Sequence, residues 1–248
     1  MIAFIYALIY FNAGADNCPT SFDFTGITEI GNEEYRNCEN SIGKNLVLSG
    51  ITKIGQFSFY KCIGITGKLT INSDADALHI EQSAFQGCTG ITELAFNDKV
   101  RYIDSNAFNG CSGIVSMKLP TYLIEIGNGA FYQCSEISCP IEIPFQVSKV
   151  GDFAFFNCSK ITSLRKDYSS EFGKYSFSYC SSITKCEIGA IKLNDGAFSY
   201  CPNLCKFDNF NNCEIKGIGV FEGCINFTGT IQIPSEWETV PEYTFAFC

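Results

Sequence analysis

Cysteine is the residue type in this chain that can take part in the most kinds of chemistry, and fifteen of the 248 residues are cysteines. A thiolate can act as a nucleophile, bind a metal ion or form a disulfide with a second cysteine. Zinc sites group their ligands closely in sequence, and no C-x-x-C spacing occurs here. Because fifteen is odd, at least one thiol stays outside any pairing within the chain. The spacing of the cysteines therefore decides which chemistry they serve.

Other residues suited to catalysis or ion binding are sparse. His79 is the only histidine, and its position in an insertion beside the segment "SDADAL" favours a surface or spacer role over a nucleophilic triad. Asp74 and Asp76 supply two carboxylates, short of the roughly six to eight oxygens that calcium takes. Gly67 and Lys68 lack the spacing of a phosphate-binding loop. We therefore expect no catalytic, metal or cofactor site, and the chain is predicted not to be an enzyme.

Ten of the cysteines share one local setting, three residues after an aromatic side chain. Successive members are 21 to 26 residues apart, which indicates tandem repeats. A unit of this length cannot bury its apolar side chains alone, whereas stacked units can. The ten pairs are Tyr35/Cys38, Phe59/Cys62, Phe85/Cys88, Phe108/Cys111, Phe131/Cys134, Phe155/Cys158, Phe177/Cys180, Phe198/Cys201, Phe221/Cys224 and Phe245/Cys248.

Each repeat contains a segment with strand spacing after its cysteine. In "GIVSMKLP", Met117 and Leu119 lie two residues apart and are predicted to face inward. Ser116 and Lys118 then face outward, because side chains alternate across a strand. Proline residues such as Pro120 end the strand. The glycine-rich segment before the cysteine, as in "IGNGAFYQC", favours a turn with a short helical return over a second long strand.

Stacking places equivalent residues of successive units about 4.8 Å apart, so the aromatic rings and the cysteines form two buried columns. A small thiol whose S–H donates to a turn carbonyl suits this position, and we interpret the ten cysteines as packing residues. Disulfide cross-linking is the alternative, because it suits a secreted chain. Cys186 is predicted to be core. Cys18, Cys139, Cys205 and Cys213 could form one or two disulfides, whose pairing stays open.

The repeats "AFNGCSGIVSMKLP", "IGNGAFYQCSEI" and "VGDFAFFNCSKIT" resemble the BspA-type leucine-rich repeats of bacterial and protist surface proteins. The resemblance covers residues 26–248 and implies an α/β-type repeat solenoid, curved and right-handed, with parallel strands on one face and short helical or turn returns on the other. It also implies surface display, adhesion and binding of host or microbial proteins, without catalysis. Three repeats depart from the pattern by one extra residue before the strand, in "GITGKLTI", "EISCPIEI" and "NFTGTIQI". Phe172 replaces the usual Ile or Val before Gly173.

The two ends of the chain differ from the repeats. Residues 1–15 combine a ten-residue apolar run with a small-x-small motif and are predicted to be a signal peptide, although no Lys or Arg precedes the run. A buried first strand of a cytosolic protein is the alternative. Residues 16–25 are predicted to be an N-terminal cap, and residues 26–248 a solenoid of about ten repeats whose C-terminal cap is absent or truncated. We expect a secreted or cell-surface protein, with the mode of membrane attachment unspecified.

Binding residues are sought on the outward strand positions, since repeat proteins recognise partners on their exposed surface. We expect a protein partner, host extracellular or microbial, on the concave face, and Asn226 matches the N-glycosylation pattern. The alternative is that a solvated sheet face is polar without binding anything. The partner-binding candidates are Lys68, Glu93, Lys118, Glu142, Arg165, Lys185, Glu187, Lys206 and Asp208.

The overall charge and the repeat period limit the other functions. A net charge of −9 and the lack of a basic run argue against nucleic-acid binding. A parallel β-helix that cleaves polysaccharides is the best enzymatic alternative, because its coils have a similar length. Three parallel sheets would favour that enzyme, whereas one predicted strand per repeat does not. An intracellular scaffold is the alternative if the signal peptide is not used.

Overall fold

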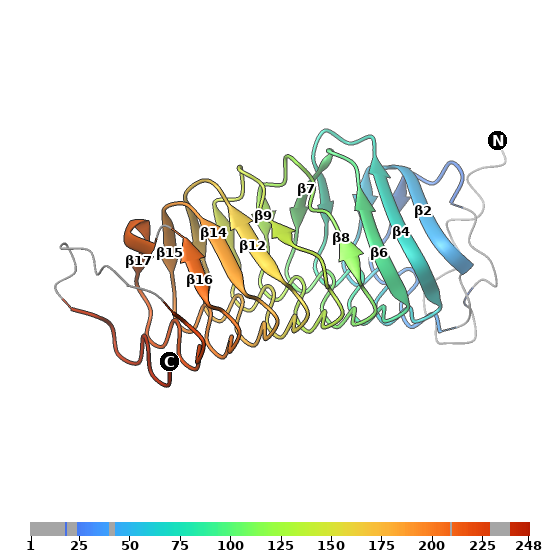
Figure 1. Cartoon of the computed structure of the whole chain (residues 1–248). Coiled ribbons are helices and arrows are strands. Elements are labelled where there is room, and N and C mark those ends of the chain that lie inside the picture. Colours follow the sequence, from blue (N-terminus) through green and yellow to red (C-terminus); the bar gives the residue numbers. More distant parts are fainter. Residues whose placement is uncertain (1–17, 19–23, 40–42, 209, 229–238) are drawn as a thin grey trace, which may run out of the picture.

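Each repeat forms one coil of a parallel β-solenoid, and the coils stack along a single axis (Figure 1). The computed structural model describes residues 18, 24–39, 43–208, 210–228 and 239–248. The predicted signal peptide and most of the predicted cap at residues 16–25 lie outside the described residues. Equivalent strands of successive coils pair in parallel. The stack of equivalent coils predicted from the repeat is therefore confirmed.

Eight coils contain two described strands each, where one strand per repeat was predicted from the sequence. The strand before the F-x-x-C unit is two to four residues long and belongs to a nine-stranded parallel sheet. So short a strand shows no alternation in the sequence, which is why it was missed. The nine strands are β1 (Glu29–Ile30), β3 (Lys53–Ile54), β5 (Leu78–Ile80), β7 (Val100–Ile103), β9 (Glu125–Ile126), β11 (Lys149–Val150), β13 (Ser170–Phe172), β15 (Ile191–Leu193) and β17 (Glu214–Ile215).

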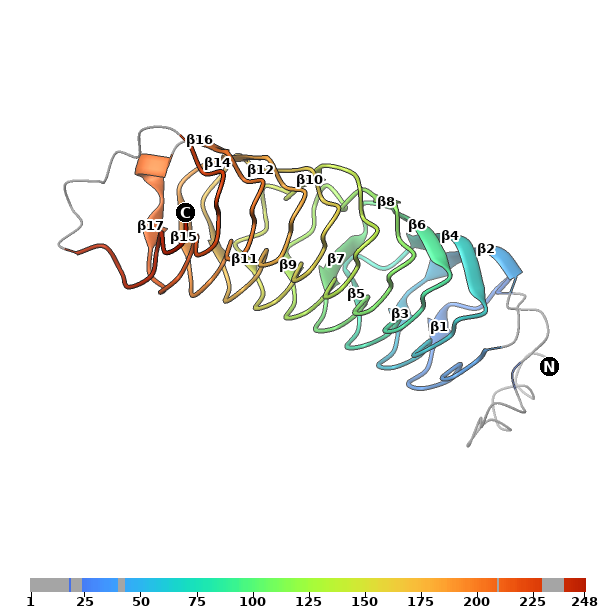
Figure 2. The same ribbon diagram turned by 60° about the horizontal axis from the view of Figure 1, so that its bottom comes forward.

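The strands after the F-x-x-C unit form two four-stranded parallel sheets. The first contains β2 (Gly43–Ile51), β4 (Ile65–Ser73), β6 (Ile91–Phe96) and β8 (Ser116–Met117). The second contains β10 (Ile141–Glu142), β12 (Ser163–Lys166), β14 (Lys185–Ile188) and β16 (Lys206–Asp208). These eight strands lie in one row along the same side of the solenoid (Figure 2). The three sheets therefore occupy two sides of each coil, and the returns form a third side that holds no described strand. The described coils thus lack the three-sided set of parallel sheets that would favour a polysaccharide-cleaving β-helix.

The helical returns predicted from the sequence are wrong. Within the described residues, the one helical element is a 3₁₀ turn at Phe210–Asn212, between β16 and β17. Each return instead holds two residues with left-handed φ, four positions apart, such as Tyr175 at 53° and Tyr179 at 60°. A positive φ ends a right-handed turn, so two tight turns replace the helix.

Neighbouring returns approach each other closely. The Phe131 N–H donates to the carbonyl oxygen of Ala154 in the next coil at 2.7 Å. Gly151 begins a return, and a Cβ at this position would collide with the backbone of Gly127 and Asn128 in the preceding coil. This close approach explains the glycine that follows the buried Ile or Val in many repeats.

The predicted column of aromatic rings is confirmed. From Phe59 to Phe245, centroids of successive rings lie 5.0 to 5.8 Å apart, and the planes are within 13° of parallel. All these Phe residues except the last are fully buried. The variant residue Tyr35 continues the column and stacks on Phe59 at 5.2 Å. The column therefore runs through every described coil and forms the centre of the core.

The cysteines form a second column beside the rings, and each thiol donates to the carbonyl oxygen of the aromatic residue one coil earlier. The Sγ of Cys111, for example, lies 3.0 Å from the oxygen of Phe85, and the Sγ of Cys134 lies 3.1 Å from that of Phe108. The same bond recurs in nine coils, from Cys62 to Cys248. The interpretation of these nine cysteines as packing residues with a carbonyl partner is confirmed.

Cys38 departs from this interpretation, because it forms a disulfide with Cys18. It belongs to the unit in which Tyr35 takes the place of the usual Phe. Cys186 is buried as predicted, and Cys213 is also buried. Cys139 is half-buried and Cys205 is exposed, and both carry free thiols.

Burial makes the thiols of the column unreactive. Desolvation raises the pKa of Cys111 and of Cys180 from 9.0 to about 12, and hydrogen bonds from the backbone offset only part of this effect. At neutral pH these side chains are thiols and not thiolates, so they cannot serve as nucleophiles or metal ligands. The cysteines of the column from Cys62 to Cys224 are therefore part of the core.

The nine-stranded sheet exposes a column of charges that the sequence analysis did not recognise. From β9 to β17 the outward residues alternate in sign, and each one pairs in register with its neighbour. They are Glu125, Lys149, Glu171, Lys192 and Glu214. Opposite charges on neighbouring strands stabilise a sheet and like charges destabilise it, so this alternation supports the register of the coils.

Replacing Phe131 by Ala should destabilise the solenoid by about 3–5 kcal/mol, because it opens a cavity between two stacked rings. Phe153→Ala is the matched control, since that side chain is 39% exposed on the neighbouring return. The control should cost less than about 1 kcal/mol. Thermal melting and denaturant unfolding of both variants measure the difference. Equal losses of stability would contradict the inward position of Phe131.

The thiol column predicts a loss of stability at alkaline pH. An unfolded thiol ionises near pH 9, whereas folded Cys111 keeps its proton until about pH 12. The folded chain therefore binds more protons in this window, and the stability present below about pH 9 falls as the pH rises. Each such thiol contributes a slope of about 1.4 kcal/mol per pH unit.

Cys111→Ala should make this slope shallower by about 1.4 kcal/mol per pH unit. Ile114→Val should leave the slope unchanged, because it alters the same buried core without removing a titratable group. Denaturant unfolding of both variants at several values of pH above neutrality measures the two slopes. Identical slopes for the two variants would show that the Cys111 thiol ionises in the folded chain as readily as in the unfolded chain.

Candidate functional site

His79 lies in β5 of the nine-stranded sheet and not in an insertion, as the sequence analysis supposed. Its ring stacks on Tyr102 with centroids 4.0 Å apart, and its Nδ1 lies 3.5 Å from a carboxylate oxygen of Asp104. Burial raises the pKa of Asp104, and the neighbouring His79 offsets part of that rise. Among the described residues, no Ser or Cys side chain bonds to His79, so this pair builds no nucleophilic triad there.

The carboxylates near the insertion form no cation site. Asp74 and Asp76 are both exposed. In the part of the chain that the structure describes, no group of three or more His, Cys, Asp or Glu side chains is placed to hold a metal ion. The remaining candidates lie on the outer surfaces of the sheets.

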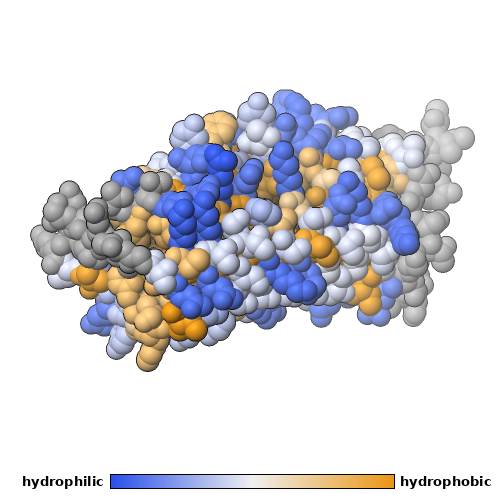
Figure 3. Space-filling model, in the orientation of Figure 1, coloured by the Kyte–Doolittle hydropathy of each residue, from blue (hydrophilic) through white to orange (hydrophobic). Residues whose placement is uncertain are grey.

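We use the term strand face for the solvent side of the two four-stranded sheets. Viewed in the orientation of Figure 1, the surface carries hydrophilic side chains with apolar patches between them (Figure 3). All nine partner-binding candidates lie on this face and are exposed or half-exposed. They are Lys68, Glu93, Lys118, Glu142, Arg165, Lys185, Glu187, Lys206 and Asp208.

Ion pairs neutralise the candidates near both ends of the strand face. Lys68 on β4 pairs with Glu93 on β6 at 2.7 Å. On β14 and β16, Lys185 contacts Glu187 and lies 3.8 Å from Asp208. Lys206 completes this second cluster at 3.5 Å from Asp208. Because these charges have partners within the chain, they attract an outside partner less strongly than unpaired charges do.

The charges in the middle of the strand face are arranged differently. Arg165 on β12 binds Asp167 through two hydrogen bonds of 3.0 and 3.1 Å, and this contact raises the pKa of the guanidinium. Lys118 and Glu142 form no ion pair within the described residues. Both side chains are exposed. The unpaired candidates therefore lie where the row of strands is interrupted, between β8 and β10.

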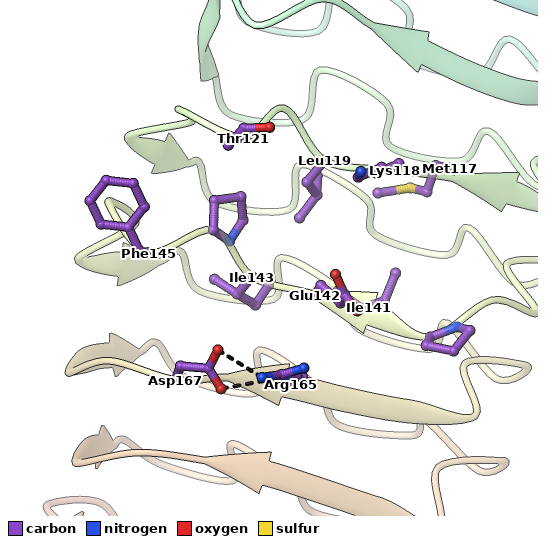
Figure 4. Close-up of a pocket in the computed structure, with 12 residues that line it drawn as sticks. Met117, Lys118, Leu119, Thr121, Ile141, Glu142, Ile143, Phe145, Arg165 and Asp167 are labelled. Carbon is purple, nitrogen blue, oxygen red and sulfur yellow. Dashed lines mark hydrogen bonds and ion pairs between the residues drawn. The ribbon is translucent and has the colours of Figure 1, made fainter.

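A cavity of about 580 Å³ lies at this interruption, and we call it the inter-sheet groove. Its charged rim includes Lys118, Glu142, Arg165 and Asp167 (Figure 4). A second cavity of about 640 Å³ adjoins it on the side of β6 and shares Lys118 with it. Three of the nine sequence candidates therefore come together around one hollow, and the other six lie outside it.

The floor of the inter-sheet groove is made of core side chains. Met117 and Leu119 on one coil face Ile141 and Ile143 on the next (Figure 4). Met117 is 8% exposed and Leu119 is 6% exposed, whereas Leu69 and Ile71, at equivalent positions of β4, are fully buried. The interruption of the sheet therefore opens a small part of the apolar core to solvent.

The interruption has a cause that is visible in the sequence. Pro140 lies at the position where the next coil carries Ser163, in the register set by the pairing of β10 with β12. Proline has no N–H to donate toward β8, so the ladder of hydrogen bonds fails there. The thiol of Cys139 donates to the Met117 carbonyl oxygen at 3.5 Å. The extra residue of "EISCPIEI", which the sequence analysis noted, precedes this strand.

Lys166 supports the wall of the groove, and the sequence analysis did not identify it. The side chain is fully buried at a strand position where other coils carry an apolar residue such as Ile143 or Ile188. Its Nζ donates to the carbonyl oxygens of Pro144 at 2.8 Å and Phe145 at 3.1 Å. Burial lowers the pKa of this ammonium group. A lysine at an inward position of the strand pattern was the available indication.

Two further expectations concern the surface. Asn226, the predicted glycosylation site, is exposed, and Thr228 of the same motif is exposed as well. The pattern also occurs at Asn157-Cys158-Ser159, where Cys158 is buried in the thiol column and Asn157 is half-buried. The described residues include no helix of the length and apolarity that a membrane span requires.

Comparison with known families and structures supports the fold. The model of the BspA type leucine rich repeat region matches residues 28–162 and 138–248, with six copies. A leucine-rich repeat protein of T. pallidum superposes with a TM-score of 0.54 at 22% identity, over 78% of this chain and 80% of that chain. Curated proteins give no match.

Two other solved structures are more distant. A leucine-rich cell surface protein from Faecalibacterium prausnitzii has a TM-score of 0.47 at 19% identity, over 84% of this chain and 71% of that one. A leucine-rich repeat protein from Bacteroides ovatus has a TM-score of 0.35 at 18% identity, over 81% and 69%.

Proposed function

The chain belongs to the family with BspA-type leucine-rich repeats, and from this premise we propose that it is a non-catalytic secreted or cell-surface protein that binds a protein partner through its strand face. The inter-sheet groove carries the proposal, because it combines an apolar floor with unpaired charges on an exposed sheet. A protein interface needs both features, apolar contacts for affinity and complementary charges for specificity.

A secreted or surface location agrees with two features of the chain. The disulfide between Cys18 and Cys38 suits an oxidising compartment. Residues 1–15 have the pattern of a signal peptide. Adhesion to host or microbial proteins is the role that such a location and a binding face support, while an intracellular scaffold would use the same face inside the cell.

Polysaccharide cleavage is the second candidate function, because the inter-sheet groove brings Lys118, Glu142, Arg165 and Asp167 together. Against it, Arg165 and Asp167 neutralise each other through two hydrogen bonds. The match to leucine-rich repeats also favours binding. Release of reducing ends from polysaccharides by the purified chain would establish this alternative.

Replacing both Lys118 and Arg165 by Glu should weaken binding of a protein partner by about tenfold or more, because two cations of the strand face become anions. The purified chain is tested by biolayer interferometry against a panel of extracellular-matrix and microbial surface proteins. The control carries Lys53→Glu and Lys216→Glu, the same change of charge outside the strand face. Equal binding by both double variants, with unchanged circular dichroism, would contradict the proposal.

Cleavage of the signal peptide should leave Asp16 as the first residue of the exported chain, because the small-x-small motif ends at Ala15. N-terminal sequencing of the protein recovered from culture medium or from the cell surface measures this. An intact Met1 on that protein would contradict the signal peptide and favour the intracellular scaffold.

A further inference from the structure

We propose that the inter-sheet groove is a peptide-binding pocket that takes a large apolar side chain lying next to an acidic residue. The inference rests on the proposed function and assigns the specificity of the strand face to one place. The occupant is an extended segment of a partner protein.

The opening of the groove is elongated along the solenoid axis. Among the described coils, the row of strands on this side is interrupted between β8 and β10, and the main cavities of the strand face adjoin there. The two cavities lie side by side along the solenoid axis and share Met117, Leu119 and Thr121. Such an elongated hollow across several coils fits an extended peptide better than a compact ligand.

The floor of the groove is apolar and partly open to solvent. Met117, Leu119 and Ile143 are 8%, 6% and 5% exposed, whereas most core residues are fully buried. The Leu119 side chain is directed across the gap toward the coil that carries Ile143 (Figure 4). Water against such a floor has few polar partners, so its displacement by an aliphatic or aromatic side chain is favourable.

The wall of the groove is held in place by contacts within the chain. The buried ammonium group of Lys166 holds the carbonyl groups of Pro144 and Phe145, and the ring of Phe145 meets the ring of Tyr168 edge-on at 6.2 Å. Phe145 is 52% exposed and forms the rim of the groove. A wall fixed before binding lowers the entropy lost when a peptide is held.

Among the described residues, the rim of the groove carries one unpaired cation. Arg165 is held by Asp167 and also feels the neighbouring Glu142. Lys118 is the one cation lining the groove that forms no ion pair within the described residues. A carboxylate on the Lys118 side of the groove, away from the exposed carboxylate of Glu142, would complement Lys118 without breaking an existing pair.

The test starts from a phage-displayed library of random linear peptides, selected on the full chain. Enriched peptides should carry Asp or Glu within two residues of Leu, Ile, Met or Phe. On the Lys118→Glu variant, the acidic preference should change to Lys or Arg while the apolar preference remains. On Lys53→Glu, which lies on the other sheet, the preference should match that of the unmodified chain.

A second variant separates the pocket from the charge. Thr121 is exposed and lines both cavities, so Thr121→Trp fills the groove without entering the core. It should raise the dissociation constant of an enriched synthetic peptide by about tenfold or more, measured by fluorescence polarisation. Circular dichroism and thermal melting of the same samples should show an unchanged fold.

The results distinguish this inference from the proposed function. Unchanged peptide affinity of Thr121→Trp, an acidic preference that persists on Lys118→Glu, or the absence of any enriched motif would each overturn the inference. If Lys118→Glu with Arg165→Glu abolishes binding of a whole partner while Thr121→Trp does not, the strand face binds proteins and the groove is not the pocket.

Discussion

The contact between the rings and thiols of successive coils is the constraint on which this structure depends. Each Phe stacks on the ring of the preceding coil, and each Cys donates to the carbonyl oxygen of that coil's aromatic residue, as Cys134 does to Phe108. Both contacts need the same rise from coil to coil, about the spacing of neighbouring strands. A coil that lost this rise would lose ring, thiol and ladder contacts together, which explains why the F-x-x-C unit tolerates so little variation along the chain.

Much of the fold could be predicted from the repeat, because the period and the aromatic and thiol positions are explicit in the sequence. The inward positions of Met117 and Cys186 followed from alternation alone. The second sheet could not be predicted, since two residues such as Glu125–Ile126 do not show a period. The returns were mispredicted for another reason. Some units carry asparagine or glycine at the left-handed positions, as at Asn106 and Gly110, but others carry residues such as Tyr175 and Tyr179, which do not indicate tight turns.

The candidate site was only partly predictable. Outward strand positions follow from alternation, so Lys118, Glu142 and Arg165 could be named as surface charges. Which of these charges are already paired depends on side-chain geometry between coils, and a sequence does not contain it. Predicting the groove requires the strand register, which aligns Pro140 with Ser163 of the next coil. Lys166 is an exception to the apolar pattern, and only the structure reveals its two carbonyl partners.

The interruption of the sheet leaves the core intact, and this separation explains how a site can form in the middle of a repeat array. Across the gap between β8 and β10, the rings of Phe108 and Phe131 stay stacked at 5.4 Å, and the ladder of the nine-stranded sheet continues from β9 to β11. The ladder on one side of the coil can therefore fail without uncoupling the coils. In a stack held by nearest-neighbour contacts, hydrogen bonds lost on one face destabilise only that face. The surface can therefore vary from repeat to repeat while the rise between coils stays constant.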